Sequence, residues 1–309
     1  MIQIAVAGPG RISRRFLDGM KDVSDGCVCA FATRNPDRVR EYAETYQIQQ
    51  TGSFDALCRD SSIHGFYVST PNHVHYEMIR QALLSGKHVI CEKPITVTGK
   101  ELRELFELAH SKNLVLMEAH KTLYTPTFRS IKEVLQNQEL GTVLEASAGF
   151  CRKEVHEDGE WRLHTPGKGA LYDVGCYGLA GLFGLFGTDM TVVSTEQNTV
   201  SGTDTGGVFH MDCGGIPMTM RYSFEQDGDC DLRIHGSQGT LICRSFWKSD
   251  RYRIQSDDGE REYHFPFRSE FTFEAQQFID RIENGIISDP ATESISLRII
   301  ELLETFSAK

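Results

Sequence analysis

The chain has 309 residues, of which 40% are hydrophobic and 24% charged, as in an ordinary globular protein that is long enough for two domains. Its formal net charge of −11 argues against a general nucleic-acid or anionic-membrane binder, since both need an exposed basic surface. No apolar run approaches the roughly 20 residues that span a bilayer. The amino terminus leads straight into a strand pattern without a charged targeting region, so we expect a cytoplasmic protein.

Cysteine and histidine spacing does not predict a metal site. The nine cysteines are scattered, and the closest pair, Cys27 and Cys29, lies within an apolar strand pattern without a second pair. His73 and His75 likewise lack a third ligand at matching spacing. We therefore expect reduced, mostly buried thiols and no bound metal.

The first predicted element is an apolar strand over residues 2 to 7, followed by a glycine turn and an amphipathic helix. The turn has the G-x-G-x-x-[G/A] spacing of a dinucleotide-binding loop, with Ser13 in the last position. Gly8 permits the tight turn, and Gly10 lets a pyrophosphate approach the backbone N–H groups that begin the helix. The cofactor contacts predicted here are Gly8, Gly10, Arg11 and Ile12.

The second predicted strand, residues 27 to 32, ends where many NAD enzymes place an acid for the ribose 2′-hydroxyl. Here Thr33 and Arg34 stand at that place. A hydroxyl and a guanidinium suit a 2′-phosphate better, which favours NADP over NAD. The alternative is that Asn35 caps a helix and Arg34 is merely solvated.

A strand–loop–helix–strand unit follows over residues 66 to 94. Its first strand breaks at Thr70, Pro71 and Asn72, and its second runs into Glu92 and Lys93. Because ligands of parallel sheets lie beyond the carboxyl ends of the strands, both breaks should line one crevice. Strands and helices alternate to about residue 119, which predicts a doubly wound parallel sheet.

Three segments, 8 to 13, 70 to 75 and 86 to 94, together resemble the signature of the glucose–fructose oxidoreductase/inositol dehydrogenase (Gfo/Idh/MocA) family. The resemblance implies that Lys93 is catalytic, that the Lys93–Pro94 peptide is cis, and that the loop after the first strand runs along the cofactor. A surface turn lysine is the alternative for Lys93. The cofactor-binding residues expected in these segments are Thr70, Pro71, Asn72, His75, Glu92 and Lys93.

The second half changes to strands with period-two alternation, which predicts a large, mostly antiparallel sheet in an α+β domain. The alternating apolar positions are Met218, Met220, Tyr222 and Phe224, then Leu232 and Ile234, Tyr252 and Ile254, and Tyr263 and Phe265. Helices over 273 to 283 and 293 to 306 would cover one face. We expect the other face to form a homodimer or homotetramer, and the domains to span 1–121 and 122–309.

Asp173 and Tyr177 are four residues apart, so on a helix both face the same side. Taken alone, Asp173 could cap the helix and Tyr177 could be a core aromatic. Relatives often carry histidine at the position of Tyr177. A tyrosine there is similar to the dimeric dihydrodiol dehydrogenase and aldose dehydrogenase branch, in which this tyrosine is the proposed acid/base.

The resemblance implies an NAD(P)-dependent oxidoreductase that transfers a hydride between nicotinamide and a carbinol carbon of a sugar, cyclitol or trans-dihydrodiol. Tyr177 would take the hydroxyl proton, helped by Lys93, because a phenol with a pKa near 10 is a poor base without a nearby cation. The two roles could also be exchanged. Asp173 would bind substrate or orient Lys93, and Lys121 is either a second pocket cation or a solvated lysine.

The outer pocket is predicted to include Trp161, Arg162, His164 and the region from Glu154 to His156. Two alternative functions remain open within the family. One is a glycosidase that retains NAD and uses transient oxidation. The other is a cofactor-sensing regulator, which would be expected to lose Lys93 or the acid/base residue.

Overall fold

The computed structural model describes residues 1–309 except 34, 49, 155–163, 229 and 308–309. The chain forms two compact units. Unit 1 comprises Met1–Ala119 and Arg268–Glu293, and unit 2 comprises His120–Phe267 and Ser294–Lys309. None of the helices in the described part of the chain is long and apolar enough to cross a membrane.

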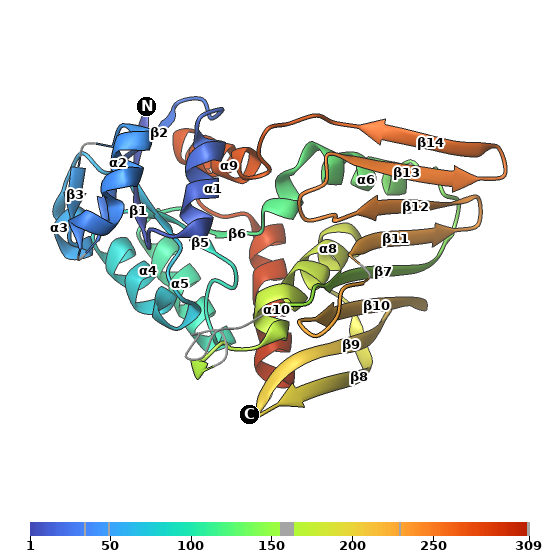
Figure 1. Ribbon diagram of the computed structural model, residues 1–309. Coiled ribbons are helices and arrows are strands. Elements are labelled where there is room, and N and C mark those ends of the chain that lie inside the picture. Colours follow the sequence, from blue (N-terminus) through green and yellow to red (C-terminus); the bar gives the residue numbers. More distant parts are fainter. Residues whose placement is uncertain (34, 49, 155–163, 229, 308–309) are drawn as a thin grey trace. The chain divides into compact units, whose positions relative to one another are not determined.

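Unit 1 contains a six-stranded parallel sheet in the order β3-β2-β1-β4-β5-β6 (Figure 1). The order reverses on either side of β1, as in a doubly wound dinucleotide-binding sheet. The strands are β1 Ile2–Ala7, β2 Gly26–Ala32, β3 Gln50–Gly52, β4 Gly65–Val68, β5 His88–Glu92 and β6 Leu116–Ala119. The connecting helices are α1 Arg11–Met20, α2 Arg40–Tyr46, α3 Phe54–Arg59, α4 His75–Leu84 and α5 Gly99–Ser111, with short turns η1 Pro36–Val39 and η2 Asn72–Val74.

The central strands of this sheet are buried. Every residue of β4 is buried, and Ile4 to Ala7 of β1 have no exposed surface. Helix α5 begins with a capping box, in which the Thr98 hydroxyl accepts the Glu101 N–H and the Glu101 carboxylate accepts the Thr98 N–H. The predicted parallel sheet is confirmed.

Helix α9, Phe271–Glu283, packs on α1 within unit 1. A Cβ on Gly19 of α1 would lie 2.8 Å from the Phe271 Cβ, so the two helices touch at that glycine. Arg15 also forms an ion pair with Glu270, and the Thr272 hydroxyl donates to the Gly19 carbonyl at 3.0 Å. Residues 268–293 therefore pack with the first unit, although the domain limits of 1–121 and 122–309 placed them in the second, and those limits stay a prediction.

Unit 2 contains an eight-stranded sheet in the order β14-β13-β12-β11-β7-β10-β9-β8. Only β7 and β10 pair in parallel, and the other neighbours are antiparallel. Its strands are β7 Val143–Cys151, β8 Thr191–Val200, β9 Thr203–Cys213, β10 Ile216–Ser223, β11 Asp231–Gly236, β12 Gly239–Arg244, β13 Arg251–Ser256 and β14 Gly259–His264. The helical elements described in this unit are η3 Lys121–Tyr124, α6 Pro126–Gln136, η4 Leu171–Gly175, α8 Cys176–Phe186 and, from Ser294 onward, α10 Pro290–Phe306.

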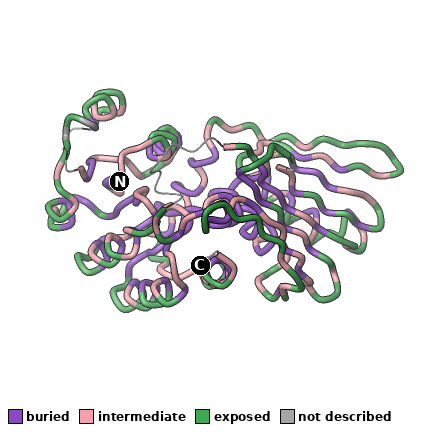
Figure 2. The backbone as a smooth tube through the Cα atoms, turned by 60° about the horizontal axis from the view of Figure 1, so that its bottom comes forward, coloured by how far each residue is buried: buried purple, intermediate pink, exposed green. Residues whose placement is uncertain are grey.

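The alternation seen in the sequence produces one fully covered face of this sheet. A row of paired residues crosses six strands, and every side chain in it is buried: Met211, Met218, Ala146, Ile234, Leu241 and Ile254. Helix α8 lies on this face, since a Cβ on Gly178 would be 2.6 Å from the Met220 Cγ. The tube in Figure 2 shows buried segments running along the strands and exposed segments at the turns.

The opposite face of the same sheet is polar and partly exposed. The matching row on that face consists of Ser194, His210, Thr219, Ser147, Arg233, Ile242, Arg253 and Glu262, of which only Ile242 is buried. Helix α8 thus covers one face of the sheet, whereas the helix predicted over 273 to 283 packs on α1 in unit 1 instead.

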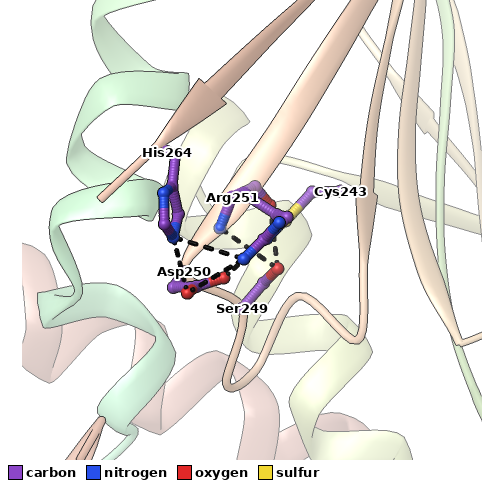
Figure 3. A network of polar contacts seen from close by, with 5 residues as sticks. All are labelled: Cys243, Ser249, Asp250, Arg251 and His264. Atoms are coloured by element: carbon purple, nitrogen blue, oxygen red, sulfur yellow. Dashed lines mark hydrogen bonds and ion pairs between the residues drawn. The ribbon is translucent and has the colours of Figure 1, made fainter. Parts of the chain in front are cut away.

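Hydrogen bonds and ion pairs join the start of β13 to the end of β14, opposite the hairpin turn (Figure 3). The Asp250 carboxylate accepts from Arg251 Nε at 3.0 Å and lies 2.9 Å from His264 Nε2. The hydrogen bond from Arg251 and the one with His264 hold the pKa of Asp250 below its usual value. Because these groups are exposed, we expect the cluster to add little to stability and to act mainly on strand register.

Candidate active site

The glycine turn after β1 is pressed against the loop after β4. Gly8 has a φ of +93°, and a Cβ there would lie 2.7 Å from the carbonyl carbon and oxygen of Ser69. The Ser69 hydroxyl donates to the Gly8 carbonyl at 2.9 Å. Any other residue at position 8 would therefore push the two loops apart.

The start of α1 offers an open backbone surface. A Cβ built on Gly10 would meet only the Gly8 carbonyl oxygen, at 4.0 Å, and Arg11 is exposed. Open space over Gly10, together with the N–H groups that begin a ten-residue helix, fits a pyrophosphate. Gly8, Gly10, Arg11 and Ile12, the residues expected to contact a pyrophosphate, make up this turn and the start of the helix.

Ser13 makes two hydrogen bonds that the motif, which asks only for a small residue at this position, does not require. Its side chain is fully buried, accepts the Gly10 N–H at 2.7 Å and donates to the Gly10 carbonyl at 2.8 Å. The serine therefore ties the glycine turn to the first turn of the helix. A motif that specifies only a small residue does not carry this information.

At the end of β2, the Thr33 hydroxyl is used within the local turn. It accepts the Asn35 N–H and donates to the Asn35 carbonyl, both at 3.0 Å. The Asn35 side chain accepts the Asp37 N–H at 3.1 Å, so the capping role considered for Asn35 is confirmed. Arg34 lies outside the described residues.

His75 joins the two loops that were expected to line one crevice. Its ring is fully buried, with Nδ1 3.0 Å from the Pro94 carbonyl and Nε2 2.7 Å from the Thr70 carbonyl. Burial lowers the pKa of His75, against the two carbonyl contacts, which raise it. Both ring nitrogens lie against backbone carbonyls, which is a positioning role.

The residues of the loop before this histidine are partly or fully buried. Thr70 and Pro71 are half-buried, and Asn72 is buried. Together with His75 they place the end of β4 beside the turn after β5.

The turn after β5 carries Glu92, Lys93 and Pro94, and the Lys93–Pro94 peptide is cis, as expected. The buried Tyr67 hydroxyl donates to Glu92 Oε1 at 2.7 Å, and the Tyr67 ring stacks on Phe16 of α1 with ring centroids 3.7 Å apart. Burial and the Glu92 carboxylate raise the pKa of Tyr67 well above its ordinary value. Glu92 and Lys93 are half-buried, so the lysine sits on a supported strand end.

In unit 2, Asp173 and Tyr177 lie on a continuous helical segment. Asp173 belongs to a π-helical turn, Leu171–Gly175, and Tyr177 is the second residue of α8. The Leu171 N–H is capped by Asp204, whose Oδ2 accepts it at 2.6 Å. The capping considered for Asp173 is therefore supplied at this N–H by a residue that the sequence did not single out. Burial raises the pKa of Asp204 to about 6.

The phenol of Tyr177 is buried beside a lysine. Lys121 Nζ donates to Tyr177 Oη at 3.2 Å and lies 5.1 Å from the centroid of the tyrosine ring. Only 4% of Lys121 and 8% of Tyr177 is exposed. Phe150 and Trp247 stack on each other with centroids 3.8 Å apart, and their rings flank Tyr177 at 5.5 and 6.2 Å.

The expectation of a solvated Lys121 is therefore wrong. The sequence signal that could have indicated a buried Lys121 is its position just beyond an apolar strand pattern, which it shares with Lys93. Of the residues predicted to line an outer pocket, His156, Trp161 and Arg162 lie outside the described residues, and His164 is exposed.

Comparison with known proteins places both halves of the chain in one family. Residues 2–120 match the family model for an oxidoreductase with an NAD-binding Rossmann fold, and residues 128–242 match the GFO/IDH/MocA C-terminal domain.

Two curated relatives and one solved structure extend this similarity over most of the chain. The scyllo-inositol 2-dehydrogenase (NADP(+)) of Bacillus subtilis is 28% identical, over 98% of this chain and 95% of that protein. The dTDP-3,4-didehydro-2,6-dideoxy-alpha-D-glucose 3-reductase of Saccharopolyspora spinosa is 30% identical, over 78% of this chain and 74% of that protein. The crystal structure of a 3-ketoreductase from Actinomadura kijaniata superposes with a TM-score of 0.90 over 98% of this chain and 96% of that chain, at 24% identity, which shows a shared fold.

Proposed function

The chain belongs to the Gfo/Idh/MocA family of NAD(P)-dependent oxidoreductases, and from this premise we propose that it interconverts a secondary alcohol and a ketone on a sugar, cyclitol or trans-dihydrodiol. The observation that carries the proposal is the supported turn of Glu92 and Lys93, which Tyr67 holds from one side and His75, through Pro94, from the other. A half-buried lysine on a fixed strand end suits polar contact with a substrate hydroxyl.

In the oxidation direction the carbinol loses a hydride and a proton and becomes a carbonyl. Nicotinamide, when bound, accepts the hydride. Tyr177, as the phenolate, takes the hydroxyl proton and becomes a neutral phenol, while Lys93 stabilises the developing alkoxide. Asp173 binds a substrate hydroxyl or orients Lys93. The alternative assignment, with Lys93 as the base and Tyr177 as a hydrogen-bond donor, needs the same residues.

We propose that the dinucleotide is held by Gly8, Gly10, Arg11 and Ile12 at its pyrophosphate, and by the Thr70 to Asn72 loop, Glu92 and Lys93 nearer its nicotinamide end. His75 supports that loop through its contact with the Thr70 carbonyl. NADP is preferred over NAD because Thr33 and Arg34 replace the usual ribose-binding acid. The name of the Bacillus subtilis relative specifies NADP(+), which points the same way.

The substrate class is supported by the relatives' names. One of them acts on an inositol and another on a nucleotide-linked keto sugar, and both compounds have a polyhydroxylated or deoxygenated six-membered ring. We propose such a ring for this chain, and a homodimer or homotetramer that buries the polar face of the unit 2 sheet.

The first experiment is to titrate the purified protein with NADPH and NADH, following cofactor fluorescence, with mass spectrometry of the protein as isolated. We expect exchangeable binding with tighter NADPH, followed by polyol-dependent reduction of NADP at alkaline pH. Tightly retained NAD, with hydrolysis of glycosides and no net cofactor turnover, would instead support the glycosidase. Equal affinity for the two cofactors would overturn the NADP preference.

A further inference from the structure

Lys121 is buried although a lysine side chain normally keeps its ammonium group in water. Only 4% of its surface is exposed, and its Nζ donates to Tyr177 Oη at 3.2 Å. Burying an ammonium group is costly unless it is paired or hydrogen-bonded. The contact with the phenol, together with the ring face 5.1 Å away, supplies partners of the kind that a buried cation requires.

The surroundings strengthen the effect of this cation on the phenol. Phe150 of β7 and Trp247 flank the Tyr177 ring without carrying a charge. Screening by water is therefore weak, and a charge 3.2 Å away acts more strongly than it would at an exposed site. Two titratable residues stand close to this pair in the chain: His120 precedes Lys121, and Asp173 stands four residues before Tyr177.

From this contact we infer that Lys121 is the positioning residue that keeps Tyr177 ready as a proton acceptor, so that Lys93 is left to act on the substrate oxygen. The inference rests on the proposed function, since it assigns a proton to Tyr177. The ammonium of Lys121 stabilises the phenolate before a substrate hydroxyl gives up its proton. After the transfer, the same contact persists as an N–H···O hydrogen bond to the neutral phenol.

The two lysines belong to different units of the chain. The Lys121–Tyr177 contact lies entirely within unit 2 and forms without any residue of unit 1. Lys93 belongs to the turn after β5 in unit 1. Two cations with separate tasks therefore replace the single lysine that the sequence was expected to use for both.

The test removes the charge at position 121 and keeps the side-chain length. In Lys121→Met, the acid limb of the pH profile of kcat/KM should move to higher pH by one unit or more, because less phenolate forms at neutral pH. That shift corresponds to about tenfold lower kcat/KM at a pH below the limb. Lys121→Arg keeps a cation and should restore most of the wild-type profile.

A matched control separates this effect from the loss of a buried lysine. Lys87 is 7% exposed and donates to the carbonyls of Asp60 and Ile63 at 2.6 and 2.7 Å, and it has no proposed role in proton transfer. Lys87→Met should lower the melting temperature and leave the position of the acid limb unchanged. If Lys121→Met and Lys87→Met both lose stability but neither moves the profile, Lys121 is structural only.

A second readout does not depend on turnover. The ultraviolet absorbance of the phenolate, identified by its loss in Tyr177→Phe, should appear at higher pH in Lys121→Met than in wild type. Identical absorbance curves in an active protein would overturn the inference while the proposed function stands. A shifted curve in a protein that oxidises no polyol or sugar would leave the Lys121 contact established and reject the proposed function.

Discussion

Single side chains in this protein act through neighbours that are distant in sequence. His75 contacts the carbonyls of two separate loops, Ser13 ties a glycine turn to its helix, and Lys121 meets a tyrosine 56 residues away. Each of these contacts fixes a backbone or a proton-bearing atom at the proposed site. The residues that do chemistry and the residues that hold them are therefore separable by substitution.

Lys93 is the first residue to substitute. Lys93→Met should lower kcat by about 10²- to 10⁴-fold, since it removes the cation that stabilises the developing alkoxide. The affinity for NADPH should change little, because the proposed pyrophosphate contacts of the glycine turn remain. Steady-state kinetics and cofactor fluorescence measure the two quantities. Lys100→Met is the matched control, because Lys100 is 84% exposed and pairs only loosely with Glu104 at 3.9 Å. Turnover like that of the wild type in Lys93→Met would remove this residue from the mechanism.

His88 supplies a pH-dependent contribution to stability. Its Nδ1 accepts the Val115 N–H at 3.0 Å, and burial, with nearby His64, lowers the pKa of His88 to about 4. The unfolded pKa is about 6.5, so the unfolded chain binds the proton first. The stabilisation is therefore fully present above pH 6.5 and is lost as the pH falls towards 4.

Denaturant unfolding at pH 7.0, 5.5 and 4.5 measures this dependence. His88→Asn keeps a side-chain oxygen to accept the Val115 N–H but cannot take up the proton. The free energy of unfolding should fall less between pH 6.5 and 4 in this variant than in wild type. Equal falls in both proteins would assign the acid sensitivity to other groups.

At the scale of elements, the parts with local periodicity were predictable and the parts that depend on long-range contacts were not. Period-two alternation identified the buried side chains of β10, β11 and β13, and glycine spacing located the turn before α1. Asp204 caps a helical turn 33 residues earlier in the chain. No spacing rule connects those positions, because the contact exists only after the sheet has formed.

Gly169 tests how the turn that carries Asp173 is held. It has a φ of +94°, and a Cβ there would lie 1.9 Å from Asp204 Oδ1. Gly169→Ala should therefore cost about 1–3 kcal/mol in backbone strain and, in addition, displace the cap of Leu171. We expect a lower melting temperature and a lower kcat, because the segment leading to Tyr177 shifts.

Gly202→Ala is the control for backbone strain alone. Gly202 has a φ of +75°, and a Cβ built on it would meet nothing within 4 Å. The backbone strain in this variant should lower its stability by a similar amount, and its kcat should stay unchanged. If both variants keep wild-type kcat, the Asp204 cap does not position the catalytic segment.

At the scale of the whole molecule, the two faces of the unit 2 sheet differ in a way that bears on assembly. Helix α8 covers one face, and Phe306 of α10 packs against Phe209 on that same face with centroids 5.2 Å apart. The other face carries Thr219 near its centre, flanked by Ser147 and His210 on the neighbouring strands. Because this face is polar and no helix of the described chain is seen to cover it, we expect it to contact a second copy of the sheet.

We expect the wild type to run at the mass of a dimer or tetramer in light scattering coupled to size exclusion. Thr219→Arg places a long, charged side chain in the middle of that face, and two copies would bring like charges together. The variant should therefore run as a monomer, or already be dissociated at protein concentrations at which the wild type is still assembled. Thr51→Arg, at an exposed threonine of β3 in unit 1, should keep the wild-type mass. A monomeric wild type, or an assembly unaffected by Thr219→Arg, would show that this face is not the interface, and the polar row would then be a solvated surface.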